Sequence, residues 1–79
     1  MEQRLREVLG ALGYTDAEVQ LEQARGGKVG GVLVSERFVG HSQEDRQAEL
    51  WRNLRANMRP EELVQIVAIM TMTPQEIAA

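Results

Sequence analysis

The 79-residue chain contains no cysteine, only one residue each of Phe, Tyr and Trp, and no long apolar run. Without cysteine it has no disulfide framework, no thiolate metal site and no cysteine nucleophile. No stretch approaches the ~18 apolar residues of a membrane span. The opening MEQRLREVLG mixes both charge signs, whereas a signal peptide has an apolar region there. We therefore expect a cytoplasmic protein that does not cross a membrane.

The chain also has fewer basic than acidic residues. The 9 Lys and Arg residues are outnumbered by 12 Asp and Glu residues, which gives a net charge of −3. This balance disfavours nonspecific binding of nucleic acid by the whole surface but leaves room for a local basic patch. So few aromatic residues leave little material for a base-stacking platform. The length predicts a single domain over residues 1–79, close to the lower size limit for a stable core.

The first half of the chain predicts a helix followed by a β-hairpin. Leu5, Val8, Leu9 and Leu12 share one face of a helix over residues 2–12, which Gly13 ends. Residues 18–23 alternate apolar and polar, as in a strand with one wet face. ARGGK (24–28) is a turn in which Gly26 and Gly27 suit positive φ. VGGVLVS (29–35) is apolar on both faces, which indicates a central strand, and its glycine pair indicates a bulge or close backbone approach.

The second half predicts two helices and a third strand. Ser42 caps a helix whose apolar face contains Leu50, Trp51, Leu54 and Met58, and we expect Trp51 to be buried against the sheet. Pro60 begins a short further turn. In the strand over residues 64–73, we expect one face to be buried along its whole length. Met70 and Met72 lie on this face and are interpreted as core filling. This face consists of Val64, Ile66, Ala68, Met70 and Met72.

The predicted order is α-β-β-α-α-β. Two strands joined through helices run parallel, so the second strand is central in a three-stranded mixed sheet. The helices cover one face, which makes a two-layer α+β domain. The hairpin loop and Gln65 then lie at one end of the sheet, towards which the second helix also brings its last arginines. His41 lies at the other end, where a lone histidine in a turn is interpreted as solvated.

Two motifs resemble those of the BolA-like family, whose fold is related to the KH domain. The first, V-S-x-x-F-x-G-x-S-x-x-x-R, lies in residues 34–46 and consists of Val34, Ser35, Phe38, Gly40, Ser42 and Arg46. The second is the terminal T-P-x-E of Thr73, Pro74 and Glu76. The resemblance covers nearly the whole chain from about residue 4, and the α-β-β-α-α-β order that it implies agrees with the pattern above.

The resemblance implies a role with monothiol glutaredoxins, in iron–sulfur cluster handling or in transcriptional regulation. In that family a histidine at the start of the last strand is a metal ligand, and Gln65 occupies this position here. A second ligand, Cys or His, usually comes from the hairpin loop, whereas ARGGK contains neither. The Arg-His pair expected after the first motif reads Arg46-Gln47.

Five basic residues are candidates for an anion or nucleic-acid patch. They are Arg25, Lys28, Arg52, Arg55 and Arg59. The three helix arginines equally suit the negative end of a helix dipole, and Glu61 and Glu62 dilute the group. GGKVGG (26–31) lacks both the G-x-x-x-x-G-K-[ST] pattern and a following helix, so we interpret it as a hairpin and bulge and not as a phosphate loop.

These observations predict a non-enzymatic BolA-like binding protein with no catalytic residues, no metal site and no cofactor. Its predicted partner is a monothiol glutaredoxin, bound without histidine ligation of a shared cluster, and Gln65 is the candidate partner-binding residue. The alternative is a KH-like nucleic-acid-binding transcriptional regulator, and a third class is a remnant that only oligomerises. The oligomeric state is left open.

Overall fold

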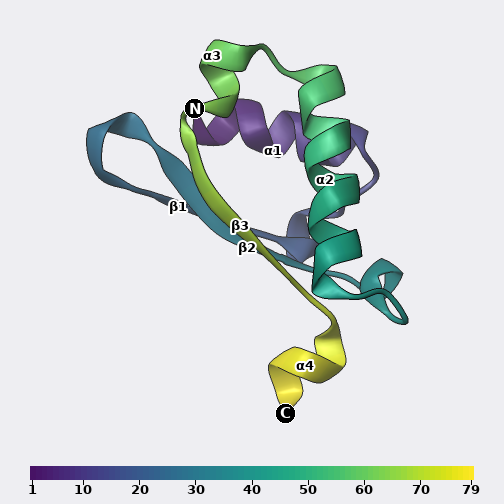
Figure 1. The fold of residues 1–79 in the computed structure, drawn as a ribbon. Helices are drawn as coiled ribbons and strands as arrows, with labels where there is room; N and C mark the ends of the chain where they lie inside the picture. Colours follow the sequence, from purple (N-terminus) through teal and green to yellow (C-terminus); the bar gives the residue numbers. More distant parts are fainter.

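In the computed structural model, which describes residues 1–79, the helices and strands follow the predicted order α-β-β-α-α-β, with a short fourth helix at the end (Figure 1). The helices are α1 (Glu2–Ala11), α2 (Gln43–Asn57), α3 (Pro60–Leu63) and α4 (Pro74–Ala78). The strands are β1 (Val19–Gln23), β2 (Val29–Val34) and β3 (Ile66–Met72). Short 3-10 turns, η1 (Asp16–Glu18), η2 (Arg25–Gly27) and η3 (Glu36–Phe38), lie in the loops.

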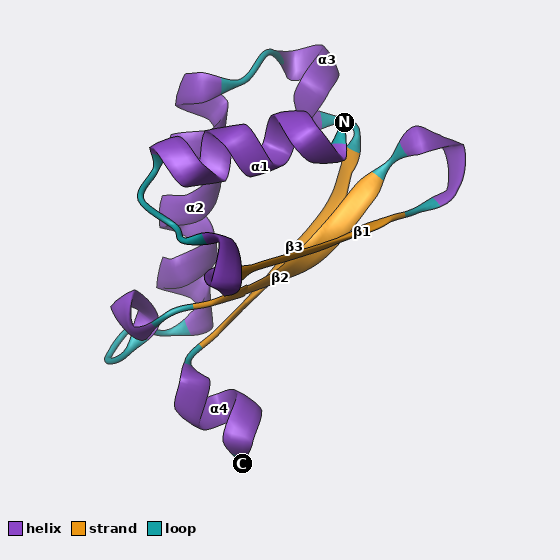
Figure 2. Ribbon diagram, turned by 180° about the vertical axis from the view of Figure 1, so that it is seen from behind, coloured by secondary structure: helices purple, strands orange, loops and turns teal.

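The sheet has β2 at its centre, as the sequence predicts. β1 pairs with β2 antiparallel, with Val19 opposite Leu33, and β3 pairs with β2 parallel, with Thr71 opposite Leu33. Figures 1 and 2 show α1 and α2 together on one face of this sheet, so the domain has two layers. The predicted α+β fold with a three-stranded mixed sheet is therefore confirmed.

The core lies between this face of the sheet and the apolar stripes of α1 and α2. Burial of one such leucine side chain contributes roughly 1.5–3 kcal/mol to folding. The stripes supply Leu5, Val8, Leu9, Leu50, Leu54 and Met58, and the sheet supplies Val19, Val29, Leu33, Ile66 and Ile69. None of the helices combines the length and the apolar character that crossing a bilayer requires.

Glycine has a defined role at three positions in the hairpin. Gly26 (φ +70°) and Gly27 (φ +77°) adopt the positive φ that the loop sequence predicts. At Gly31 a β-carbon would collide with the backbone oxygen of Gln20, and the pairing of β2 with β3 is irregular between Val29 and Gly31. Of the two alternatives predicted for the glycine pair, the close backbone approach is present at Gly31, whereas the extra residue of the bulge lies on β3 and not at the glycines.

The predicted buried face of the third strand is wrong except at Ile66. The pairing advances from Val29 to Gly31 on β2 but from Ile66 to Ile69 on β3, so β3 contains one extra residue. Such a bulge shifts the alternation of side chains between the two faces. As a result Ile69 and Thr71 are buried beneath the helices together with Ile66.

The residues that we expected to follow Ile66 into the core lie elsewhere. Ala68 is exposed, and Met70, paired with Val32, is 57% exposed on the face without α1 and α2. Met72 is half-buried, and Val64 is exposed just before the strand. The interpretation of Met70 as core filling is therefore wrong, because the bulge turns it outward.

The apolar face of α2 matches its prediction except at Trp51. Ser42 caps the helix, since its Oγ accepts a hydrogen bond of 3.1 Å from the Asp45 amide. Leu54 is fully buried, but Trp51 is only half-buried at the margin of the core. Its indole N–H donates a hydrogen bond of 3.1 Å to Oε1 of Gln47 on the same helix.

Candidate functional site

Gln65 lies in the short connection between α3 and β3. Its carbonyl oxygen accepts a hydrogen bond of 2.8 Å from the Val29 amide, and its own amide donates one of 3.0 Å to the Glu62 carbonyl. The backbone at Gln65 is therefore held between α3 and the foot of the hairpin. Its side chain is half-buried and makes no hydrogen bond within the chain.

The hairpin loop from Ala24 to Lys28 lies beside this connection. Its base closes through a hydrogen bond of 2.7 Å from the Ala24 amide to the Lys28 carbonyl. Arg25 and Lys28 are exposed and take part in no ion pair. We call this loop together with Gln65 the hairpin end. The predicted adjacency of Gln65 and the loop is thus present in the backbone pairing.

Four of the five candidate basic residues separate into two groups. Arg25 and Lys28 are on the hairpin, whereas Arg52 and Arg55 are exposed on α2, and Figures 1 and 2 show these elements on opposite sides of the molecule. Arg59 precedes α3, where its Nε lies 3.3 Å from Glu61 Oε1. Its charge is therefore partly neutralised by its neighbour, whereas Arg25 and Lys28 on the hairpin take part in no ion pair.

The acidic residues of α3 form ion pairs with arginines. Arg4 Nε lies 3.0 Å from Glu62 Oε2, which ties α1 to α3. The Arg59 backbone amide also donates to Glu62 Oε1, and these hydrogen bonds, the backbone one first, lower the pKa of the Glu62 carboxyl. Glu62 is therefore engaged in holding the two helices together.

No grouping of three His, Cys, Asp or Glu residues that could hold a metal occurs in the chain. His41 is exposed in the loop before α2, at the opposite end of the sheet from Gln65. Its carbonyl oxygen accepts a hydrogen bond of 2.8 Å from Arg46 Nε. His41 therefore contributes its backbone to the fold and is remote from the hairpin end.

A polar cluster that sequence reasoning missed lies at the other end of β3. Arg46 is only 7% exposed, and its guanidinium donates to both carboxylate oxygens of Glu76, at 2.8 and 3.3 Å. The same group donates to the Thr71 carbonyl at 3.3 Å and lies 5.7 Å from the centre of the Phe38 ring. The pairing lowers the pKa of Glu76, and the hydrogen bond from the Thr73 amide lowers it further.

Two glutamines of α2 complete this cluster. Gln43 Nε2 donates to the Thr71 carbonyl at 2.7 Å, and Gln47 Nε2 donates to the Ile69 carbonyl at 2.8 Å. We call Gln43, Arg46, Gln47 and Glu76 the clasp, because they join α2, β3 and α4. The signal was present in the sequence, since Arg46 and Glu76 belong to the two separate motifs.

Comparison of the chain with protein-family models, with curated proteins and with solved structures found no match.

Proposed function

We propose that this chain is a non-enzymatic BolA-like binding protein whose partner is a monothiol glutaredoxin, and that the partner docks at the hairpin end. The observation that carries the proposal is the hydrogen bond of 2.8 Å between the Val29 amide and the Gln65 carbonyl. It brings Gln65, the residue directly before β3, next to the hairpin loop. These are the two positions from which the resembled family takes its metal ligands.

The side chains at these positions predict docking without histidine ligation. An amide oxygen is a poor ligand for the iron of a cluster, whereas a neutral imidazole is a good one. Arg25 and Lys28 are cationic and repel a metal ion. The protein therefore binds its partner through surface contacts at this end and leaves the cluster coordinated by other groups.

The proposal is tested by titrating the protein with a monothiol glutaredoxin, both without a cluster and with a [2Fe–2S] cluster. Calorimetry should detect a complex in either state, and the cluster spectrum should show no nitrogen ligand from this chain. Gln65→His should introduce such a ligand in part, and Arg25→Cys in addition should strengthen it. Gln75→His, in α4 at the far end of β3, is the matched control and should have no effect.

Two results would contradict this proposal separately. Absence of any complex with the glutaredoxin would show that a monothiol glutaredoxin is not the partner. A complex of the unmodified protein in which spectroscopy detects a nitrogen ligand from its own chain would retain the partner but overturn the proposed mode of docking.

Nucleic-acid binding is the second candidate, favoured by the exposed and unpaired Arg25 and Lys28. Reversal of both charges to Glu should weaken the binding of all nucleic-acid sequences similarly. It should also reduce the slope of the logarithm of affinity against the logarithm of salt concentration by about one for each phosphate contact that is lost. The same reversal at Arg52 and Arg55 is the control, since they belong to the other basic group. If a labelled duplex and a labelled single strand both fail to bind at low salt, this candidate is withdrawn.

A further inference from the structure

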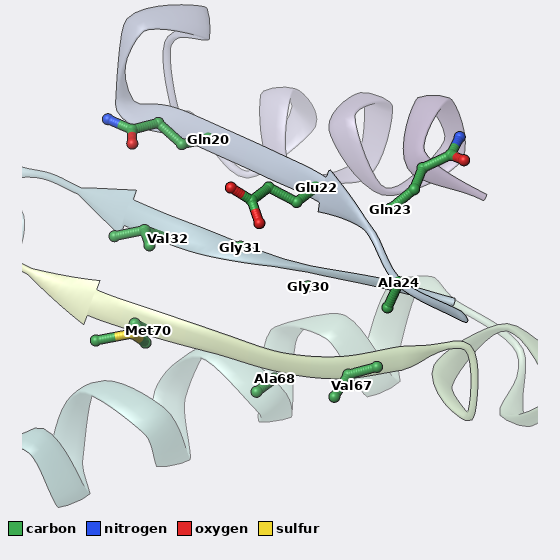
Figure 3. A pocket seen from close by; sticks show the side chains of 10 residues that line it. All are labelled: Gln20, Glu22, Gln23, Ala24, Gly30, Gly31, Val32, Val67, Ala68 and Met70. Carbon is green, nitrogen blue, oxygen red and sulfur yellow. The ribbon is translucent and has the colours of Figure 1, made fainter. Parts of the chain in front are cut away.

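The face of the sheet opposite α1 and α2 contains a hollow of about 360 Å³ between β1 and β3 (Figure 3). Its floor is Gly30, which has no side chain and pairs with Glu22 of β1. On the other side lies the bulge of β3, at Val67 and Ala68. The hollow exists because a glycine and a bulge face each other at the same level of the sheet.

The walls of the hollow are mainly apolar and accessible. Val67 is 60% exposed and Met70 is 57% exposed, and Val32 lies between Met70 and β1. Exposed apolar side chains that gather in one place, in contrast to single scattered ones, are typical of interaction surfaces. We call the hollow lined by Glu22, Gly30, Val32, Val67, Ala68 and Met70 the sheet groove.

Glu22 is the one ionisable residue among the residues that line the sheet groove. Figure 3 shows its carboxylate directed from β1 over the strand that carries Gly30 and Gly31. None of the ion pairs or side-chain hydrogen bonds of the chain includes it. The groove therefore combines an apolar surface with one negative charge that the chain itself does not neutralise.

We propose that the sheet groove binds an extended protein segment that presents a lysine or arginine between aliphatic residues. The long methylene stem of such a side chain packs on apolar surface while its charged end stays in water. Here the stem lies over Gly30 and against Val32 and Met70, and the cation meets Glu22. Aliphatic neighbours in the segment contact Val67.

The same chemistry argues against nucleic acid at this surface. A phosphate group would meet only the negative charge of Glu22, and the groove offers no aromatic ring on which a base can stack. The hollow extends to Ala24 at the base of the hairpin loop, so the sheet groove adjoins the hairpin end. Its occupant is argued from Glu22 and the apolar lining alone, so this proposal does not rest on the identity of the partner that docks at the hairpin end.

The test uses three peptides that differ at one position, Ac-Thr-Val-Lys-Val-Thr-NH2 and its Gln and Glu versions. Each is titrated into the ¹⁵N-labelled protein, and the amide signals of Gly30, Gly31, Val67 and Ala68 are followed. The Lys peptide should shift these signals. Its affinity should exceed that of the Gln peptide about threefold and that of the Glu peptide about tenfold, as expected for one solvent-accessible charge pair.

Charge reversal in the protein makes the test specific. Glu22 is exposed, so Glu22→Lys should fold and should invert the order, with the Glu peptide binding best. Glu7→Lys, a matched reversal at an exposed position of α1, should leave the order unchanged. If Glu22→Lys does not fold, Glu22→Gln serves instead, because loss of the charge should cancel the preference between the Lys and Glu peptides.

Three results would overturn the proposal. Equal affinity for the three peptides would show that Glu22 does not select the ligand. Signal shifts confined to other residues would show that the peptide does not bind in the sheet groove. If the groove signals shift on concentrating the protein alone and no peptide competes, its occupant is a second copy of the chain.

Discussion

The two ends of β3 differ in how far the chain satisfies its own polar groups. At the clasp, the side chains of Arg46, Gln43 and Gln47 all donate to backbone or side-chain oxygens of β3 and α4. At the hairpin end, only backbone groups are bonded, and the side chains of Gln65, Arg25 and Lys28 have no partner within the chain.

This difference separates stability from binding. A polar side chain whose hydrogen bonds are used within the fold contributes to stability, and its loss leaves a buried group without a partner. A polar side chain without such bonds contributes little to stability and is free to bind another molecule. Variants at the clasp should therefore change unfolding, and variants at the hairpin end should change binding alone.

The largest effect is expected from Arg46→Ala. It removes the donors to the His41 and Thr71 carbonyls and the packing against Phe38. With the loss of a nearly buried cation, we expect a decrease of about 3 kcal/mol in the free energy of unfolding, measured by urea denaturation. Arg52→Ala, at an exposed position of the same helix, should change it by less than about 0.5 kcal/mol. Similar values for the two variants would mean that the clasp does not stabilise the fold.

Trp51→Ala should have the next largest effect. A fully buried tryptophan would cost about 3 kcal/mol or more, but Trp51 is half-buried, so we expect about 2 kcal/mol. Part of this loss arises because Gln47 Oε1 no longer receives the indole N–H. Trp51→Phe retains most of the ring and removes only that donor, so urea denaturation should give it a smaller loss. A loss as large as that of a buried tryptophan would place the ring in the core.

Gln47 and Gln65 form a matched pair, since both are half-buried glutamines beside β3, one on α2 and bonded to the strand, the other directly before the strand and unbonded. Gln47→Ala leaves the Ile69 carbonyl without its donor and should cost about 1 kcal/mol. Gln65→Ala should change the free energy of unfolding by less than about 0.5 kcal/mol. Urea denaturation of the two variants side by side tests the comparison, which fails if Gln65→Ala is the more destabilising.

The smallest effect is expected from acid acting on Glu76. Its pKa lies below the ordinary value of 4.5 because of the hydrogen bonds from Arg46 and the Thr73 amide. Its ionised form therefore stabilises the fold above about pH 4.5, and this contribution is lost as the pH falls through the lower pKa of the folded state. Glu18 and Glu62 also have lowered pKa values and act in the same direction.

Urea midpoints at about pH 7 and pH 3 measure this contribution. The difference between the two midpoints should be smaller for Glu76→Gln than for the unmodified chain. Glu7→Gln is the control, because Glu7 takes part in no ion pair, and it should keep the full difference. An unchanged difference in Glu76→Gln would show that the carboxylate of the clasp does not contribute.

The order of the elements and of the strands could be predicted because the signals are local. Gly26 and Gly27 mark the hairpin, Ser42 marks the start of α2, and a connection through helices makes β3 parallel to β2. The adjacency of Gln65 and the hairpin loop follows from that topology. The binding role of Gln65 and the identity of the partner stay predictions.

The rest depends on contacts between distant parts of the chain. The bulge in β3 arises in its pairing with β2, so a strict alternation along residues 64–73 assigned Met70 to the wrong face. The clasp joins Arg46 to Glu76, which lie on different elements, and spacing alone does not show that they meet. The sheet groove combines Glu22 of β1, Gly30 of β2 and the bulge of β3. No one of these three features indicates a cavity by itself.

The clasp also determines where the sheet is able to grow. The Met72 carbonyl accepts a hydrogen bond from the amide of Ser35, directly after β2. The neighbouring Thr71 carbonyl, and that of Ile69 two residues earlier, therefore point away from β2. These are the acceptors that an incoming strand would use on the free edge of β3, and Gln43, Arg46 and Gln47 already bind them. Unpaired strand edges invite intermolecular sheet formation and aggregation. Along this part of β3, side chains of α2 occupy those acceptors and oppose the templated addition of another chain.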